Sequence, residues 1–415
     1  MRIIADLHIH TRYSRATSKE MTLPTIAHWA KRKGITLVGT GDFTHPQHLK
    51  AIEEELVPAE EGLFLFEDTP EVRFMLTAEI SNIYSEAGRL RKIHTLVFAP
   101  SLEAAQRLTD KLKTLGNVYA DGRPIFGFSV VELLKMALDI SEDFLLVPAH
   151  AWTPWFSIFG SKSGFDSIEE CFGDYSRYIH AIETGLSSNP EMNWRLSALD
   201  GITLLSNSDA HSPAKLGREA NVFSCELSYP AIMDVIKTKD PERFLFTIEF
   251  FPEEGKYHYD GHRECGVVFS PEETRKAGGL CPVCGKGVTV GVMNRVEELA
   301  DRPQGFVPEG AIPQRSLIPL EEIIAEALGK GVNTAAVKKE YRRMTDAYDE
   351  FTILMELTEE ELQRIAPPMV MEGILKMRRG DVKISPGFDG EFGKIKLFEE
   401  PEKPQTKGPT QMGLF

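Results

Sequence analysis

Short apolar segments typical of buried strands alternate with amphipathic helices along residues 1–252, and metal-binding side chains follow the strands. Strands are expected over residues 2–9, 35–39, 73–80, 92–99, 144–148, 178–183 and 203–206, and helices over 22–33, 101–115 and 130–138. This alternation predicts an α/β fold on a parallel sheet, open or closed into a barrel. In barrels the reacting groups come from the carboxyl ends of the strands, so residues there are the candidates for a site.

Nine histidine and carboxylate side chains stand at the ends of these predicted strands. They are His8, His10, Asp42, His45, Glu79, His94, His150, Asp209 and His211. His8 and His10 share one face because successive strand residues point to opposite sides. One such residue alone would more often be a hydrogen-bonded core group, but nine buried ionisable groups all need partners. A divalent metal supplies them, and histidines with carboxylates suit Zn²⁺, Mn²⁺ or Fe²⁺ at a multinuclear hydrolytic site.

This ordered set resembles the PHP superfamily, named for polymerase and histidinol phosphatase, over roughly residues 1–250. The resemblance implies a distorted (β/α)7 barrel with a trinuclear metal site that hydrolyses phosphoesters, using Zn²⁺ or, as alternatives, Mn²⁺ or Mg²⁺. One metal would take His8, His10, Glu79 and Asp209, which are also the expected catalytic residues, and a second would take Glu79, His94 and His150. A third would take His211 with Asp42 or His45, because Thr40-Gly41-Asp42-Phe43-Thr44-His45 stands where the superfamily has Thr-Asp-His.

The charge balance argues against a chain that binds nucleic acid over its whole surface. The 47 basic and 62 acidic residues leave a formal net charge of −15, whereas such proteins usually carry a basic surface. A local basic groove or bound metal can still reverse the sign near a site. Arg12, Arg15, Lys162 and Arg218 lie near the candidate ligands and are expected to hold phosphate, although each is also a common type of surface residue.

An aromatic cluster follows His150. Trp152, Trp155 and Phe156 fall in a segment that the sequence predicts to be a loop, where polar residues are usual. Two interpretations stay open: the cluster packs in the core beneath the loop, or it forms a stacking surface or wedge for a nucleobase.

A second metal motif lies beyond residue 252. His262, Cys265, Cys281 and Cys284 give the spacing His-x2-Cys-x15-Cys-x2-Cys, which predicts a closed structural zinc site. His258 is an alternative first ligand because it stands only a few residues upstream. The expected role of this knuckle is to shape a binding surface.

The whole chain resembles the endonuclease Q family of DNA repair nucleases, most clearly over residues 183–190, 217–223 and 255–262. The resemblance implies binding of damaged double- or single-stranded DNA and cleavage 5′ to hypoxanthine, uracil, xanthine or an abasic site. The ends left would be a 3′-hydroxyl and a 5′-phosphate, and the damaged base would be extruded into a pocket. Two alternatives stay open: a small-molecule phosphatase of the histidinol phosphate type, and a scaffold whose metals are structural.

Composition divides the chain into four expected parts: a catalytic barrel over 1–252, a zinc knuckle over 253–300, a helical DNA-binding or support region over 301–398, and a flexible tail over 399–415. Gln411, Leu414 and Phe415 in that tail resemble a peptide that docks on the bacterial sliding clamp, although an apolar end could also fold back on the body.

The remaining features concern the compartment. The sequence has no apolar run of transmembrane length and no signal-peptide pattern at its start. Five cysteines, three of them clustered, suit a reducing environment better than a disulfide framework. We therefore expect a cytoplasmic, nucleoid-associated protein with no membrane partner.

Overall fold

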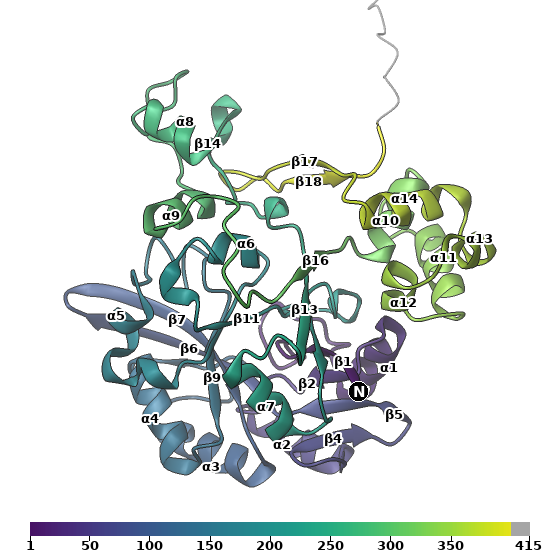
Figure 1. Ribbon diagram of the computed structural model, residues 1–415. Helices are drawn as coiled ribbons and strands as arrows, with labels where there is room; N and C mark the ends of the chain where they lie inside the picture. The colour runs from purple at the N-terminus through teal and green to yellow at the C-terminus, as the bar shows by residue number, and fades with distance from the viewer. Residues whose placement is uncertain (400–415) are drawn as a thin grey trace, which may run out of the picture.

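Strand β1 (Arg2–Asp6) lies in the middle of an eight-stranded mixed sheet in the computed structural model, which describes residues 1–399 (Figure 1). The strand order is β16-β13-β12-β1-β2-β5-β4-β3. The bounds are β2 (Leu37–Gly39), β3 (Val57–Pro58), β4 (Leu63–Phe66), β5 (Thr69–Met75), β12 (Ala220–Ser224), β13 (Phe244–Glu249) and β16 (Gln314–Ser316). Strand β1 pairs in parallel with β2 and antiparallel with β12.

A four-stranded sheet stands beside it, in the order β8-β6-β7-β9. Its bounds are β6 (Thr77–Glu86), β7 (Arg89–Phe98), β8 (Ile125–Phe126) and β9 (Leu145–Pro148). Strands β6 and β7 form one long antiparallel hairpin, closed by Ala87 and Gly88, which both have positive φ angles. A two-residue turn of this kind matches the twist of an antiparallel pair. A third sheet pairs β10 (Ala181–Glu183) in parallel with β11 (Thr203–Leu205).

The expectation of a parallel sheet is therefore correct only in part. The pairs β1–β2, β2–β5, β6–β8, β10–β11 and β13–β16 are parallel, but β6–β7, β7–β9, β1–β12 and β12–β13 are antiparallel. The alternating pattern missed the hairpin because residues 81–91 are largely polar, so the strands expected over 73–80 and 92–99 looked separate. The α/β class itself is confirmed.

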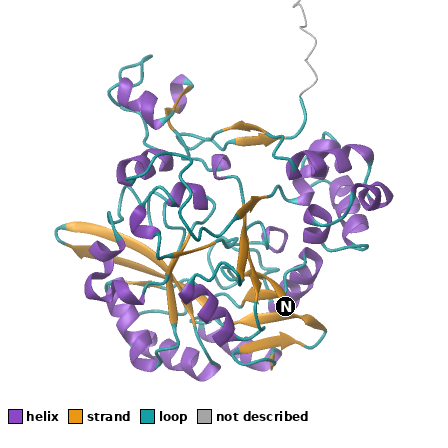
Figure 2. Cartoon of the chain, viewed as in Figure 1, coloured by secondary structure: helices purple, strands orange, loops and turns teal. Residues whose placement is uncertain are grey.

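Helices cover the outer faces of these sheets (Figure 2). They are α1 (Leu23–Lys33), α2 (Pro46–Glu55), α3 (Leu102–Lys113), α4 (Val130–Ile140), α5 (Ile168–Phe172), α6 (Pro190–Asn193) and α7 (Tyr229–Thr238). Helix α1 begins with Pro24 in its first turn and ends at Gly34, whose φ of 86° is a conformation that glycine adopts readily. Its buried side, with Ile26 and Ala30, faces the core.

One apolar core joins the sheets. It contains side chains from strands of all three sheets, including Ile3, Leu37, Leu96, Leu205 and Phe223. A second core lies between the outer faces of the sheets and the helices and includes Ile4, Ile26 and Leu108. Strand β1 is thus apolar on both sides, which explains its continuous run of buried residues after Arg2.

Two lobes extend the body after residue 252 (Figure 1). The knuckle lobe contains β14 (Asp260–His262), β15 (Val267–Phe269), α8 (Pro271–Lys276) and α9 (Val292–Leu299). The helical lobe comprises α10 (Leu320–Ala327), α11 (Ala335–Thr345), α12 (Glu350–Met355), α13 (Glu359–Ile365) and α14 (Pro368–Arg378). The hairpin of β17 (Lys383–Ser385) and β18 (Lys394–Lys396) lies between the lobes.

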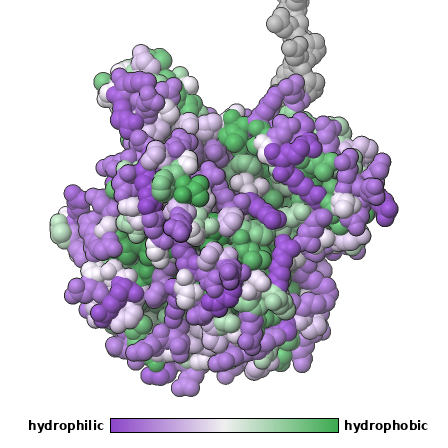
Figure 3. Space-filling model, in the orientation of Figure 1, coloured by the Kyte–Doolittle hydropathy of each residue, from purple (hydrophilic) through white to green (hydrophobic). Residues whose placement is uncertain are grey.

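The surface of this face is mixed in polarity. Apolar residues gather in the hollow between the two lobes, while polar residues dominate the outer rim (Figure 3). Across residues 1–399, the helices are all too short or too polar to cross a membrane.

Candidate metal centre

Two chain segments bring His8, His10 and Asp209 together. Strand β1 ends at Asp6, so both histidines follow the strand rather than lie on it. Ile9 and Ala210 form a parallel bridge, and the backbone N–H of His10 donates to Ala210 O at 2.9 Å. Asp209 Oδ1 consequently lies 3.2 Å from His10 Nε2 and 3.6 Å from His8 Nε2.

Glu79 links this group to a second one. Its Oε2 lies 3.1 Å from His10 Nε2, and its Oε1 lies 2.7 Å from His94 Nδ1 and 3.1 Å from His150 Nε2. Glu79 and His94 were expected at strand ends, but both lie inside the β6–β7 hairpin. The hairpin passes the site and directs these side chains inward, so the residues converge although their predicted placement was wrong.

These groups have the chemistry of a cation site. His8 Nε2, His10 Nε2 and Asp209 Oδ1 are buried and make no hydrogen bond within the described part of the chain. Buried polar atoms normally have partners, so three unsatisfied atoms that face one another indicate a missing positive ligand. Glu79, His94 and His150 likewise place their ligand atoms within 4.8 Å of one another. Imidazole and carboxylate ligands of this kind fit a divalent metal.

Glu183 orients the histidines from behind. It accepts hydrogen bonds from His8 Nδ1 at 3.0 Å, from the backbone N–H of His150 at 2.8 Å and from Asn207 Nδ2 at 3.0 Å. A carboxylate that holds Nδ1 leaves Nε2 free to face a metal. The sequence offered a signal for Glu183, because it ends the predicted strand 178–183, yet it was not among the nine candidates.

Asp42 has a similar place beside His10. Its Oδ1 lies 3.1 Å from His10 Nδ1, and its Oδ2 accepts from the backbone N–H of Thr11 at 2.7 Å and from Ser14 Oγ at 2.9 Å. Although burial opposes ionisation, the hydrogen bond with His10 lowers the pKa of Asp42 to about 2. Both carboxylate oxygens are therefore already engaged.

The residues expected at a third metal position do not gather as a group. His45 immediately precedes helix α2, and its ring stacks on that of Tyr13 at 4.5 Å between centroids. His211 is partly exposed, and its Nδ1 lies 2.9 Å from Asp209 O. In residues 1–399 none of the clusters of three or more candidate ligand atoms includes His45, His211 or Asp42. A third metal at these residues stays a prediction.

The two groups differ in protonation. Burial lowers the pKa values of His8 and His10, but nearby carboxylates outweigh it and raise both well above the usual histidine value. At His8 these are chiefly Glu183 and Asp209, and at His10 they are Asp209, Asp42 and Glu79. Burial dominates at His94, where it lowers the pKa to about 4. Without a cation, His8 and His10 thus carry protons that a metal would displace, whereas His94 is neutral.

The predicted phosphate-binding residues lie in different surroundings. Arg12 and Arg15 are exposed, and Arg15 pairs with Asp121 at 3.4 Å. Arg218 donates from Nε to Ser208 O at 2.8 Å, so it holds the loop that carries Asp209. Lys162 is exposed on a loop whose backbone contacts Pro154.

Sequence reasoning missed Arg123, a cation in direct contact with a carboxylate of the cluster. Its Nη1 lies 2.9 Å from Glu79 Oε2, and its side chain is only partly exposed. Arg123 falls in the connection between α3 and β8, where no strand, helix or motif distinguishes it. Nothing in the sequence pattern could have identified this residue.

The aromatic cluster separates into a core part and an exposed part. Trp152 is 1% exposed and donates its indole N–H to Asn193 Oδ1 at 2.8 Å, so its interpretation as a stacking surface is wrong and core packing applies. Trp155 is 45% exposed. Phe156 lies against the metal cluster, with its ring centroid 4.6 Å from that of His94.

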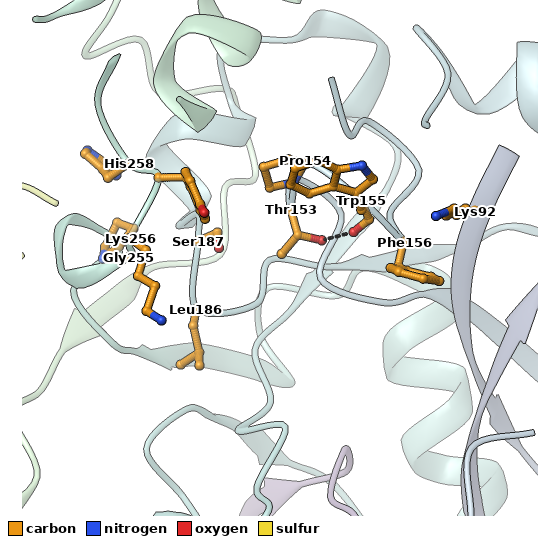
Figure 4. Close-up of a pocket in the computed structure, with 12 residues that line it drawn as sticks. Lys92, Thr153, Pro154, Trp155, Phe156, Leu186, Ser187, Gly255, Lys256 and His258 are labelled. Atoms are coloured by element: carbon orange, nitrogen blue, oxygen red, sulfur yellow. Dashed lines mark hydrogen bonds between the residues drawn. The ribbon is translucent and has the colours of Figure 1, made fainter. Parts of the chain in front are cut away.

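Trp155 and Phe156 line a cavity of about 650 Å³ next to this cluster (Figure 4). Thr153 and Pro154 complete one side, and Leu186, Ser187, Lys256 and His258 stand across from them. Thr153 Oγ1 lies 3.2 Å from His150 Nδ1, which ties the wall of the cavity to a candidate ligand. The cavity is therefore a direct extension of the candidate centre.

The knuckle lobe brings the expected knuckle residues together. His262, Cys265, Cys281 and Cys284 place their ligand atoms within 4.8 Å of one another. His258 instead lines the cavity beside the metal cluster. Gly285 has a φ of 72° and its backbone N–H donates to Cys281 O at 2.8 Å, which closes the tight turn of the knuckle. Three sulfurs and one imidazole form a donor set that suits structural zinc.

Comparisons with known proteins identify the relatives of this fold. The chain is 34% identical to the lesion-specific endonuclease PfuEndoQ from Pyrococcus furiosus, with a TM-score of 0.85 over 95% of each chain. Identity is also 34%, with a TM-score of 0.83, to endonuclease Q solved with a duplex that carries an abasic lesion at the active site; the match covers 96% of this chain and 97% of that one. The uncharacterized protein YqxK of Bacillus subtilis strain 168 is 31% identical over 95% of this chain and 99% of its own. Residues 319–381 match the family model described as the MJ0043 C-terminal domain.

The fold and the two histidine–carboxylate groups place this protein among the metal-dependent DNA endonucleases. Within that class, the chain belongs to the endonuclease Q family. The resemblance found in the sequence is thereby confirmed.

Proposed function

We propose that this protein cuts DNA on the 5′ side of hypoxanthine, uracil, xanthine or an abasic site, leaving a 3′-hydroxyl and a 5′-phosphate. The observation that carries the proposal is the cavity of about 650 Å³ directly beside the histidine–carboxylate cluster. Cavities of this volume commonly bind small molecules. An enzyme that recognises a damaged base must move that base out of the stacked duplex.

The catalytic assignment rests on the arrangement of Glu79. We propose that His8, His10 and Asp209 hold one cation and His94 and His150 another, with Glu79 shared between them, as its two oxygens already face both groups. Bound divalent cations supply Lewis-acid activation of the phosphodiester and of water. Zn²⁺ fits these ligands, and Mn²⁺ or Mg²⁺ are the alternatives.

In this proposal, residues around the cluster orient its histidines, neutralise charge and stack on the base. Asp42 and Glu183 fix the rings of His10 and His8 through Nδ1. Arg123 contacts Glu79 and would neutralise the charge of a phosphate held at the same place. Trp155 offers an exposed aromatic face at the mouth of the cavity, where a base can stack.

Three further expectations belong to the same proposal. A closed (β/α)7 barrel is supported by the apolar core that strands of these three sheets share. Structural zinc in the knuckle is supported by the Cys₃His donor set. Docking on the sliding clamp would use Gln411, Leu414 and Phe415, which lie outside the described residues.

The test is cleavage of 5′-labelled duplexes, each with one deoxyuridine, deoxyinosine or abasic site, with Mn²⁺, Mg²⁺ or Zn²⁺. A single product that ends just 5′ of the lesion, absent with undamaged DNA, is the expected result. Asp209→Asn should lower the rate by about 100-fold or more, because it weakens a ligand of the reacting centre. No cut on any duplex, with release of phosphate from small phosphomonoesters, would contradict the proposal.

A further inference from the structure

Helix α11 carries a row of basic side chains on its exposed face. Its buried side, with Val337, Tyr341 and Met344, packs in the helical lobe. On the opposite side Lys338, Lys339, Arg342 and Arg343 are all exposed. Residues spaced in this way share one face of a helix, so four positive charges gather there in a chain whose formal net charge is −15.

Most of these charges have no acidic partner. Arg343 pairs with Glu340, but Lys338, Lys339 and Arg342 make no ion pair with any carboxylate of residues 1–399. Asp346, the acidic residue on the same face, is itself engaged by Arg32 at 3.1 Å. Within the described chain, these three cations therefore make no direct ion pair, although the charge of Lys338 also acts on Glu321.

A groove lies between this face and the segment that follows His211. It has a volume of about 740 Å³, and its lining includes Ser18, Ser212, Ala214, Lys338 and Arg342. Ser18 is joined to the segment that carries Asp209, because its backbone N–H donates to His211 O at 2.8 Å. The acidic residues that line the groove are Glu20, Glu321 and Asp346, and burial raises the pKa of Glu321.

The basic face is also held firmly relative to the centre. Lys33 on α1 and Glu350 on α12 form a buried ion pair at 2.6 Å, and Tyr341 of α11 donates its hydroxyl to the same Glu350 oxygen at 2.7 Å. Trp29 on α1 stacks on the ring of Tyr341 at 6.1 Å between centroids. Helix α11 is therefore fixed against the body that carries the ligands.

We infer that Lys338, Lys339 and Arg342 bind the phosphodiester backbone of the duplex beside the cut, with the groove as the path between the two sites. This inference rests on the proposed function, since it names where the flanking DNA lies. Regularly spaced phosphates are the anions that match a row of cations on a rigid helix, and such contacts position DNA without reading its sequence.

The experiment compares the triple variant Lys338→Ala/Lys339→Ala/Arg342→Ala with the wild type in binding a long duplex over a series of salt concentrations. Loss of three phosphate contacts should weaken binding by about tenfold or more and lower the slope of log K against log[salt] by about 2 to 3. The matched control Arg107→Ala/Lys111→Ala/Lys113→Ala removes equal charge from α3, at the opposite end of the molecule, and should retain the wild-type slope (Figure 1).

The outcomes separate the two hypotheses. An unchanged slope in the α11 variant, or an equal loss in the α3 control, would overturn the inference even if the wild type cuts lesions as proposed. Absence of lesion cleavage by the wild type would refute the proposed function alone, because binding of undamaged duplex still measures the α11 contacts. Thermal melting of both variants tests whether the substitutions leave the fold intact.

Discussion

The protonation of His8 and His10 gives the metal centre a pH dependence that can be measured. Carboxylates raise the pKa values of both histidines well above the usual range, whereas burial lowers that of His94 to about 4. Because a metal binds the deprotonated ring, cation binding at His8 and His10 must release protons and weaken as the pH falls. Cation binding at the second group, formed by Glu79, His94 and His150, displaces no proton from His94.

We expect Mn²⁺ binding to release up to about two protons per chain near neutral pH. Calorimetric titration in buffers with different ionisation enthalpies measures this release directly. The His94→Ala variant should keep the release, because His8 and His10 are intact, whereas His8→Ala should lower it by about half. Binding that is independent of pH between about 6 and 8 would contradict the assignment of these histidines as ligands.

At the scale of elements, the sequence predicts ligands better than it predicts the strands that carry them. His8, His10 and Asp209 converge as expected because a short parallel bridge joins the segments after β1 and β11. Glu79 and His94 also converge, but they do so through an antiparallel hairpin. The hydrophobic pattern did not predict this hairpin because its middle is polar. Arg123 has no local signal, since its contact with Glu79 arises only from tertiary folding.

The four knuckle residues could be identified from their spacing alone, because all four ligands close one small loop structure. We expect about one zinc ion per chain at this site, and Cys281→Ala should lose it, since three ligands hold structural zinc poorly. Metal analysis after mild chelation measures the content. Cys225→Ala is the matched control, because Cys225 lies outside the cluster and is only partly buried. Equal zinc content in the two variants would show that the knuckle does not bind metal.

At the scale of the whole molecule, the helical lobe is joined to the catalytic body by polar contacts that are almost completely buried. Lys33 and Glu350 are each 4% exposed, and Glu350 also accepts from Tyr341 Oη and from the backbone N–H of Leu320 at 3.0 Å. Removing one partner of such a pair leaves a buried charge without compensation, which costs far more than the pair itself contributes. The lobe and the body should therefore unfold together in the wild type.

Lys33→Met tests this coupling. The substitution leaves Glu350 buried without its cation, so we expect a loss of about 3–5 kcal/mol in unfolding free energy. Lys31→Met is the control on the same helix, because Lys31 pairs with Glu71 at 2.7 Å with both side chains 55% exposed, and such surface pairs contribute about 0–1 kcal/mol. Denaturant titration followed by circular dichroism measures both. If Lys33→Met and Lys31→Met proved equally stable, the buried pair would not be what holds α11 against the body that carries the metal centre. The fixed position of α11 for DNA binding would then lose its physical basis.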